Sequence, residues 1–561
     1  MDNTDLEVKS LVDKISIGEL ILPEMQREYV WKSTNVRDLF DSLYRGYPSG
    51  VILVWETDED VDTRNFAVET NKQRSTKWLL LDGQQRLTSL AAITKGEGVT
   101  VRDRKKEVRL LFNLDHPDEL QFDTEDEYSE TEEPEDEQQI LQERLNRQTF
   151  VVFNKKLASL PQWVDVSDIF LKSDTDLLRE AGVMIFDDPR FEKYKERISR
   201  VRSIEKYKYR VEVLDRHKSY DEVTEIFVRV NSLGVKLRSS DLALAQITAK
   251  WRGALKIFTE YQESTKNVLD FDINLGLILR TLVSLITNQS RFARVGSMTL
   301  EMLQDGWKRT TRSFDFALDF AKSNLRIDTT ALLSSPFLLV ATAYWADNRN
   351  YQPSEEDAAE FKRWFMIANA KGHYSGSSET KLDQDIAIIR KGGDGRELID
   401  KLLTEIGRLD FTAKELSGRN TNSGAFKTLF MALRADGAQD WESNLEISPK
   451  HKGESDKIEY HHIFPKKYLE RVRPDLLESN GRAINQIANL AFIGGRTNRH
   501  ISDKAPSDYR ENYDSRQLAT QLIDFYDGRD RPENYEQFID YRLELMARKL
   551  NEFLGVEPGQ S

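Results

Sequence analysis

No cysteine occurs among the 561 residues of the chain, and only seven residues are histidine. Without cysteine there can be no disulfide, no thiolate nucleophile and no zinc site built on thiolates. A bound metal ion would therefore have to be held by histidine, asparagine or carboxylate side chains. A chain without cysteine is also compatible with a reducing compartment, and we expect a cytoplasmic protein.

Long apolar runs are missing as well. The two longest, LGLILRTLVSLI and FLLVATAYWA, are shorter than the ~20 apolar residues that a helix needs to span a bilayer. The first ten residues, MDNTDLEVKS, are acidic where a secretory signal would be basic. We therefore expect a soluble protein without a membrane partner, with two to four domains because of its length.

The net charge of −14 argues at first against a nucleic-acid partner. Ten acidic residues and no basic one lie in the segment 123–137, and the rest of the chain carries only −4 once these ten are set aside. We interpret this segment as a solvated loop. Residues 451–510 hold eleven Lys or Arg against eight Asp or Glu, so a local basic surface is compatible with the sequence.

Patterning divides the chain into three regions: an N-terminal domain at 1–245, a helical scaffold at 246–440 and a C-terminal domain at 441–561. The first alternates helical patterns with short β-rich runs, which predicts an α/β domain. The middle region has apolar residues at three-and-four spacing, and Ser354 stands three residues before Asp357 as in a capping box. The fold class predicted is α+β with several domains. The strands are expected in 50–57, 77–83, 107–114, 149–154 and 207–215, and the helices in 239–251, 311–325 and 353–370.

The last region contains four of the seven histidines, two of them adjacent in YHHIFPKKYL at His461 and His462. Downstream, Asn489 precedes the strand-like LAFIG, and Asn498 follows a Gly-Gly-Arg-Thr turn. The pattern predicts a hairpin followed by a helix that carries Asn498.

Such a unit suits phosphodiester hydrolysis, which needs a base for water and an electrophile for the charge on the phosphate. Adjacent strand residues point to opposite faces, so His461 and His462 are expected to do different jobs. One imidazole can act as base near neutral pH, and the Asn498 carbonyl can bind a divalent cation such as Mg²⁺. The residues expected to contact a nucleic-acid backbone are Lys466, Lys467, Arg496, Arg499 and Lys504.

A second polar group lies in KWLLLDGQQRLTSLAAI, where a buried strand leads into a helix. Asp82, Gly83, Gln84, Gln85 and Arg86 occupy this junction. A strand-to-helix junction favours phosphate binding at the positive helix end. Asp-Gly turns before helices are common, however, so an ordinary turn remains the alternative.

The string from EYHHIFPKKYL to ANLAFIGGRTNRHISDKAP resembles the His-Asn-His (HNH, ββα-metal) nuclease domain of GmrSD-type restriction endonucleases. The resemblance implies that His462 is the general base, that Asn489 pins the loop across the motif, and that His461 and Asn498 are metal ligands for Mg²⁺ or Mn²⁺. Two features depart from the common pattern: Asn replaces His at 498, and 27 residues separate His462 from Asn489. The alternative is that the two histidines are ordinary polar strand residues.

Three N-terminal strings, QREYVW, DGQQR and FVRVNSLGVKL, resemble the GmrS-like domain, which is related to the ParB/sulfiredoxin fold. The resemblance implies binding and hydrolysis of a nucleoside triphosphate, GTP or ATP. Tyr29 and Trp31 are expected in the core rather than against a base. The candidate pocket residues are Gln26, Arg27, Asp82, Gly83, Gln84, Gln85 and Arg86.

The resemblance as a whole implies a nucleotide-regulated, metal-dependent DNA endonuclease of anti-phage defence that acts on modified phage DNA. The phosphorothioate-sensing SspE is similar in architecture and has a different trigger, so the modification that is sensed stays open. Which nucleotide is bound, whether one or both DNA strands are cut, and whether the chain forms a homo-oligomer also stay open. Two alternatives also stay open, a nucleotide-hydrolysing DNA sensor with a vestigial nuclease and an RNA-directed HNH toxin.

Overall fold

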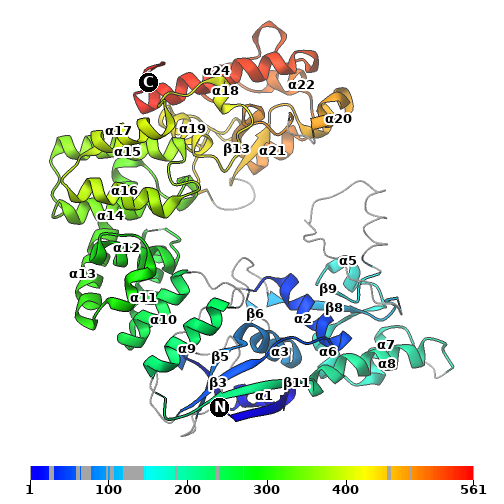
Figure 1. Cartoon of the computed structure of the whole chain (residues 1–561). Coiled ribbons are helices and arrows are strands. Elements are labelled where there is room, and N and C mark those ends of the chain that lie inside the picture. The colour runs from blue at the N-terminus through cyan, green and yellow to red at the C-terminus, as the bar shows by residue number, and fades with distance from the viewer. Residues whose placement is uncertain are drawn as a thin grey trace. The chain divides into compact units, whose positions relative to one another are not determined.

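The computed structural model describes residues 2–23, 31–57, 63–64, 77–96, 99–100, 107–117, 145, 147–183, 187–218, 220–233, 239–269, 271–451, 457–479 and 483–559. Two compact units make up the chain, Met1–Leu255 and Lys256–Ser561. Figure 1 shows small sheets among many helices, which confirms the α+β class. In the described ranges, no helix is long and apolar enough to cross a membrane. The acidic segment 123–137 lies outside them.

A mixed sheet of six strands forms the centre of the first unit. Its order is β1-β11-β3-β5-β2-β4. β11 runs parallel to β3, β2 runs parallel to β5, and the remaining neighbours are antiparallel. The strands are β1 (Asp2–Glu7), β2 (Leu20–Pro23), β3 (Ile52–Thr57), β4 (Thr63–Arg64), β5 (Lys77–Asp82) and β11 (Lys208–Leu214).

Two smaller sheets and ten helical segments complete the described part of this unit. One sheet has the order β10-β8-β9, and the other pairs β6 with β7. These strands are β6 (Val99–Thr100), β7 (Glu107–Val108), β8 (Leu110–Asn113), β9 (Phe150–Val152) and β10 (Trp163–Asp165). The helices are α1 (Val8–Ser16), α2 (Ser33–Arg45), α3 (Gln84–Lys95), α5 (Lys155–Ala158), α6 (Val166–Leu171), α7 (Asp174–Glu180), α8 (Phe191–Arg202), η1 (Ser203–Lys206), α9 (Tyr220–Leu233) and α10 (Ser239–Lys250).

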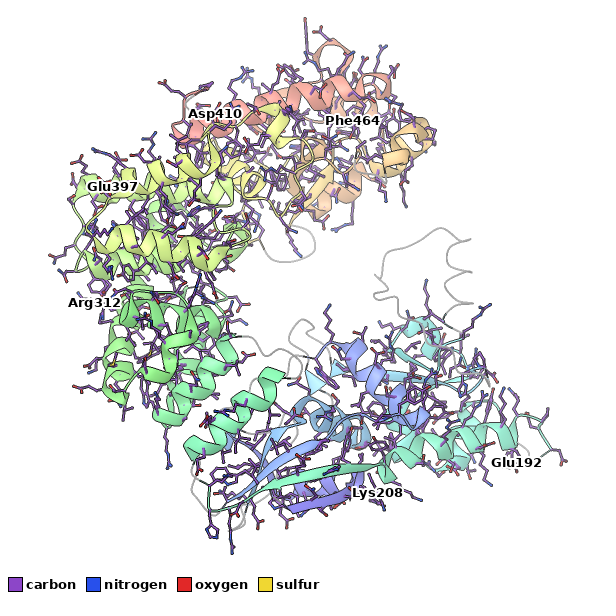
Figure 2. All side chains as sticks on the ribbon, in the orientation of Figure 1. Glu192, Lys208, Arg312, Glu397, Asp410 and Phe464 are labelled. Carbon is purple, nitrogen blue, oxygen red and sulfur yellow. The ribbon has the colours of Figure 1, made fainter. Side chains whose placement is uncertain are left out.

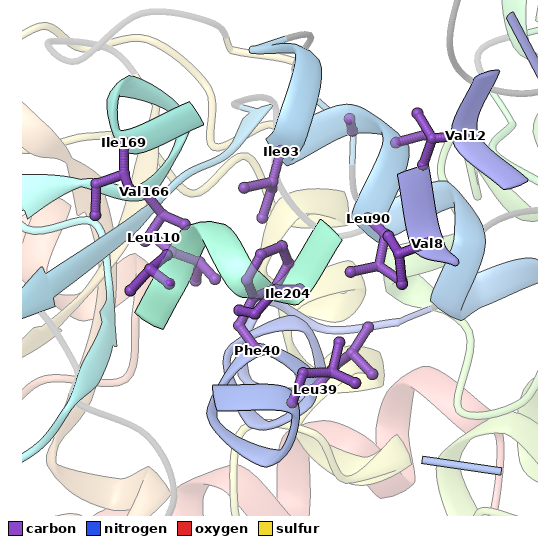
Figure 3. Packing of buried hydrophobic residues seen from close by; sticks show 14 of the residues in the cluster. Val8, Val12, Leu39, Phe40, Leu90, Ile93, Leu110, Val166, Ile169 and Ile204 are labelled. Carbon is purple, nitrogen blue, oxygen red and sulfur yellow. The ribbon is translucent and has the colours of Figure 1, made fainter. Parts of the chain in front are cut away.

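The two faces of the six-stranded sheet belong to different hydrophobic clusters. Val54 and Leu80 join the large cluster with α1, α2 and α3, part of which Figure 3 shows from close by. Trp55 and Leu79 join a smaller cluster with α9 and α10. Successive strand residues point to opposite faces, so runs such as ILVW and LLL are apolar because both faces are covered. Each strand predicted from the sequence in this region contains an observed strand.

The second unit is mainly helical, as the sequence predicts for 246–440. Ser354 caps α15 by accepting a 3.1 Å hydrogen bond from the Asp357 amide, as its spacing predicts. The division of this unit into a scaffold and a domain at 441–561 stays a prediction. Its helices are α11 (Ala254–Leu269, which begins in the first unit), α12 (Leu275–Thr287), α13 (Leu300–Asp319), α14 (Phe337–Asn348), α15 (Glu355–Lys371), α16 (Ser378–Arg390), α17 (Gly395–Ile406), α18 (Ala413–Leu416), α19 (Gly424–Ala435), α20 (Lys466–Val472), α21 (Gly495–Ile501), α22 (Pro506–Tyr509), α23 (Ser515–Thr520) and α24 (Tyr535–Leu554). Short 3₁₀ and π segments connect them: η2 (Phe292–Ser297), η3 (Phe320–Asn324), η4 (Thr330–Leu332), η5 (Pro474–Ser479), η6 (Ile487–Asn489), η7 (Arg510–Asn512), η8 (Tyr526–Gly528) and η9 (Pro532–Asn534).

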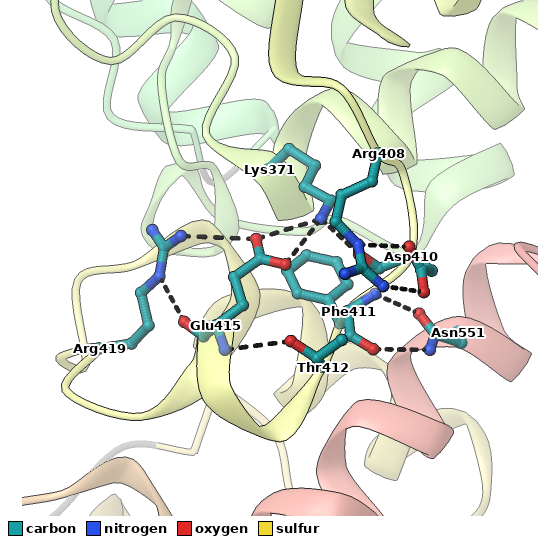
Figure 4. A network of polar contacts seen from close by, with 8 residues as sticks. All are labelled: Lys371, Arg408, Asp410, Phe411, Thr412, Glu415, Arg419 and Asn551. Carbon is teal, nitrogen blue, oxygen red and sulfur yellow. Dashed lines mark hydrogen bonds and ion pairs between the residues drawn. The ribbon is translucent and has the colours of Figure 1, made fainter. Parts of the chain in front are cut away.

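A polar network joins α15 to the C-terminal helix α24. Figure 4 shows Lys371, at the end of α15, donating to the Asp410 carbonyl at 2.8 Å and to the Glu415 carboxylate at 3.1 Å. The amide of Asn551 in α24 bonds both backbone groups of Phe411, at 2.7 and 3.0 Å. Figure 2 labels Asp410, which belongs to this network, and Phe464, which lies two residues after His462. The scaffold and α24 are therefore parts of one packed body.

A second network is centred on Asp385, which is fully buried. Its carboxylate accepts hydrogen bonds from His373 Nε2 at 2.8 Å, the Tyr374 hydroxyl at 2.7 Å and Lys401 Nζ at 2.9 Å. Burial acts to raise the pKa of Asp385, but the bonds from His373 and Lys401 outweigh it and lower that pKa. The carboxylate is therefore ionised and satisfied.

We expect Asp385→Asn to lower the free energy of unfolding by about 3 kcal/mol, because it removes the buried charge to which His373, Tyr374 and Lys401 donate. Urea denaturation measures this change. Asp400→Asn is the matched control, since Asp400 is exposed on the neighbouring helix α17 and should change stability little. Equal stability of the two variants would show that the buried Asp385 network does not stabilise this unit.

Candidate active site

The histidine pair lies on the first strand of a strand–strand–helix unit. β12 (Ile458–His462) pairs antiparallel with β13 (Leu490–Gly494), with His461 opposite Ala491 and His462 opposite Leu490. α21 (Gly495–Ile501) follows β13 directly and carries Asn498. The hairpin and helix predicted from the sequence are confirmed. The long interval between the two strands holds α20 and the short η5 and η6 segments.

His461 and Asn498 meet across this unit. His461 Nδ1 lies 2.8 Å from Asn498 Oδ1, and Asn498 Nδ2 donates to Glu459 Oε2 at 2.7 Å. The Glu459 carboxylate accepts only, so it sets the direction of the Asn498 amide and leaves the amide oxygen facing His461. His461 must therefore donate through Nδ1. Glu459 was not among the residues predicted from the sequence, although its place two residues before His461 puts both on one face of β12.

Aromatic rings enclose His461, which is only 2% exposed. The Trp441 and Tyr509 rings contact it edge to face, with centroids 5.7 and 6.0 Å away. Burial lowers the pKa of His461 to about 4, and the neighbouring His462 contributes in the same direction. His461 is therefore neutral near pH 7. Its Nε2 atom is buried and has no hydrogen-bond partner among the described residues.

The His461 and Asn498 pair fits a single divalent cation. Two adjacent ligands of an octahedral ion such as Mg²⁺ lie about 3 Å apart, close to the 2.8 Å between Nδ1 and Oδ1. A cation held by both atoms would replace their hydrogen bond, and the neutral imidazole would then carry its proton on Nε2 and bind the cation through the Nδ1 lone pair. Within the described part of the chain, no three His, Asp or Glu side chains cluster as a closed metal cage. The site would thus hold an ion that keeps most ligand positions for water and phosphate.

His462 faces a different partner. Its Nε2 lies 2.9 Å from Oδ1 of Asn485, a residue that was not predicted from the sequence. Burial lowers the pKa of His462, and the bond to Asn485 acts in the opposite direction. The imidazole is therefore neutral near pH 7, as a general base requires.

Asn489 pins the loop that follows His462. Its Oδ1 accepts from the Phe464 amide at 2.8 Å, and its Nδ2 donates to the carbonyls of Phe464 and Ile484, both at 3.0 Å. The side chain is fully buried. These contacts match the pinning role that the resemblance implies.

Four further buried polar side chains hold this unit from outside. Arg542 of α24 donates to the carbonyls on either side of Asn489, those of Ala488 at 2.7 Å and Leu490 at 2.8 Å. The Gln521 amide bonds both backbone groups of Phe492 at 2.8 Å, as a neighbouring strand would. Tyr509 donates to the Ile463 carbonyl at 2.6 Å, and Asp440 accepts from the Gly494 amide at 2.7 Å. Only Asp440 has a local signal, the Asp-x-x-Ser turn with Ser443.

The predicted nucleic-acid contacts are exposed around the same unit. Lys466 and Lys467 lie in the first turn of α20, directly after the histidine strand, and Arg496 and Arg499 lie on α21. Lys504 follows α21 and donates to the His500 carbonyl at 2.9 Å. Lys466 pairs with Glu470 at 3.6 Å.

The N-terminal candidates Asp82 to Arg86 lie at the junction of β5 and α3, as predicted. Gly83 has φ +98°, and a Cβ there would approach Ile52 Cδ1 to 2.3 Å, so glycine is required. Arg86 donates to the carbonyls of Ser49 at 2.5 Å and Val51 at 2.9 Å, and to Asp82 at 3.0 Å. These donors bind the protein itself, and phosphate binding by Arg86 stays a prediction.

Gln84 and Gln85 begin α3 and are both buried. Gln85 Oε1 accepts from the Trp31 amide at 3.1 Å, and Trp31 packs against the hydrophobic cluster, as expected for a core residue. Gln26 and Arg27 lie outside the described residues. The structure therefore brings together Asp82 and Arg86, and it places Gln85 beside the segment that follows Gln26 and Arg27.

Comparison with known proteins matches both ends of the chain. Residues 8–248 match the model of the GmrSD restriction endonuclease N-terminal domain, and residues 407–549 match that of the C-terminal domain. An uncharacterized protein of Methanocaldococcus jannaschii, MJ0686, is 24% identical over 541 residues, which cover 89% of this chain and 85% of that protein. Both histidines, Asn489 and Asn498 fall inside the second match, and Asp82 to Arg86 fall inside the first.

We expect Asn489→Ala to lower the free energy of unfolding by about 2–4 kcal/mol, because it leaves buried backbone groups of Phe464 and Ile484 unpaired. Chemical denaturation measures the loss. Asn422→Ala is the matched control, since Asn422 is exposed in the same unit. A variant as stable as the control would show that Asn489 does not pin the loop.

Proposed function

We propose, from the premise that the chain belongs to the GmrSD restriction endonuclease family, that its C-terminal region is an HNH-type nuclease that cuts DNA by metal-assisted hydrolysis. One observation carries the proposal: His461 and Asn498 approach to 2.8 Å at the end of the strand on which His462 is held by a separate partner. His461 is thus placed to bind a cation, and His462 is placed to accept a proton.

In the proposed mechanism His462 accepts a proton from the attacking water. The oxygen of that water forms a bond to phosphorus while the bond from phosphorus to the 3′ oxygen breaks in line. The products carry a 5′ phosphate and a 3′ hydroxyl. The lowered pKa of His462 supports this role, because it keeps the imidazole able to accept a proton near neutral pH.

His461 and Asn498 would hold the divalent cation, Mg²⁺ or Mn²⁺, with Glu459 fixing the Asn498 amide. Such an ion, when bound, stabilises negative charge on the phosphate and on the leaving oxygen. The exposed cations on α20, on α21 and at Lys504 would contact the DNA backbone.

We further propose that the N-terminal unit binds GTP or ATP at Asp82 to Arg86 and thereby controls cleavage of modified phage DNA in the cytoplasm. The helix start at Gly83 supports this, because the positive end of α3 attracts phosphate. A nuclease that makes few base contacts needs a separate domain to decide when it cuts.

We expect His462→Ala to abolish cleavage of plasmid and phage DNA, because the attacking water loses its base. EDTA should abolish wild-type cleavage, and added Mg²⁺ or Mn²⁺ should restore it. Gel assays with modified and unmodified DNA, with and without GTP or ATP, measure these effects.

His217→Ala is the control, since His217 is an exposed histidine of the other unit. Cleavage by His462→Ala at the wild-type rate would refute the assigned base. A wild-type protein that hydrolyses nucleotide but cuts no DNA would favour a sensor, and cleavage of RNA alone would favour a toxin.

The basic residues give a separate prediction about salt. Lys467→Gln and Arg496→Gln should each reduce the slope of log binding constant against log salt by about 1, because each removes one phosphate contact. Fluorescence anisotropy with duplex DNA measures the slope. Lys362→Gln is the control, an exposed cation on α15 far along the chain. Unchanged slopes would place the DNA elsewhere.

A further inference from the structure

We infer that Asn485 is a positioning residue that selects the tautomer of His462 and fixes the direction of its ring, an inference that rests on the proposed function. Oδ1 of Asn485 faces Nε2 of His462 at 2.9 Å. An amide oxygen carries no hydrogen, so the proton in this bond belongs to Nε2. A neutral imidazole has a single N–H, and Nδ1 therefore keeps the lone pair that accepts a proton from water.

The Nδ1 atom of His462 is available for this task. None of the described residues forms a hydrogen bond to it, and the side chain is only half-buried. We therefore assign the contact with the attacking water to Nδ1, while Nε2 remains held. Without Asn485 the imidazole could turn about its Cβ–Cγ bond or move its proton to the other nitrogen.

Hydrogen bonds fix the backbone beside both Asn485 and His462. Ala483, two residues before Asn485, accepts a 2.8 Å bond from the Tyr535 hydroxyl of α24. Asn489 binds the carbonyl of Ile484, next to Asn485, and both backbone groups of Phe464, two residues after His462. One buried amide thus fixes the distance between the chain segments that carry the imidazole and its partner.

Without a bound cation, the neighbouring histidine is held in the opposite tautomer. His461 donates through Nδ1 to Asn498, whose amide direction is set by Glu459. Two adjacent imidazoles therefore meet two different amide oxygens through different ring nitrogens. This arrangement explains how the chain assigns separate roles to side chains that are chemically identical.

We expect Asn485→Ala to lower kcat by about 10- to 100-fold with little change in KM for DNA, because it disturbs the orientation of the base and not the binding of substrate. Asn485→Asp keeps an acceptor oxygen at the same position and should retain more activity than the alanine variant. Asn512→Ala, at an exposed asparagine of the same unit, is the control for general effects of substitution. Equal unfolding midpoints would show that all variants are folded.

A second measurement reads the tautomer without any cleavage. The full chain is labelled with ¹⁵N at its seven histidines, and the His462 signals are assigned by their loss in His462→Ala. At a pH where the imidazole is neutral, we expect Nε2–H alone in the wild type and in Asn485→Asp, and a mixture or a rapid average in Asn485→Ala.

The two measurements fail in different ways. A wild-type His462 in the Nδ1–H form, or the same tautomer mixture in wild type and Asn485→Ala, would overturn the inference whatever the cleavage result. Unchanged kcat in Asn485→Ala would overturn the positioning role. A wild type that shows the expected tautomer and cuts no DNA would refute the proposed function and leave the tautomer assignment standing.

Discussion

The geometry of the candidate site depends on the buried amide of Asn489. A two-stranded sheet with five residues in each strand is marginal by itself, and the chain after His462 leaves the sheet with unpaired backbone groups. Asn489 binds these groups at Phe464, and Gln521 binds both backbone groups of Phe492. Side chains thus do the work of missing strands. The unit keeps its shape through satisfied polar groups as much as through apolar packing.

Side chains of α24 likewise bind backbone groups in other parts of the second unit. Tyr535 binds the segment before Asn485, Arg542 binds the carbonyls around Asn489, and Asn551 binds Phe411 in the scaffold. Arg542 is fully buried with carbonyls as its partners, and burial lowers its pKa to about 9. It therefore stays charged near pH 7, and the carbonyls it binds cannot easily find other partners. One helix connects the site to the scaffold, so residues 256–561 pack as one unit although the sequence changes character near 440.

Much of the site follows from local pattern, and the rest does not. The strand with His461 and His462, the strand after Asn489 and the helix with Asn498 are each encoded within about ten residues, so periodicity and turn residues reveal them. Asn485 and Arg542 act on this unit from 23 and more residues away, and nothing in their neighbours marks them. Their roles arise only when the chain closes on itself. Glu459 is an intermediate case, because strand alternation places it on the face of His461 but does not show that it binds Asn498.

The distribution of charge affects DNA at contact differently from DNA at a distance. The chain carries −14 overall, yet Lys466, Lys467 and Arg496 are exposed beside the histidine strand. At physiological ionic strength exposed charges interact over about 8 Å, so a phosphate bound at these cations would feel them more strongly than it feels distant parts of the chain. A chain with this distribution has weak attraction for DNA at a distance and adequate attraction at contact. If the chain cuts DNA as proposed, such a distribution keeps its affinity alone from bringing it to every duplex.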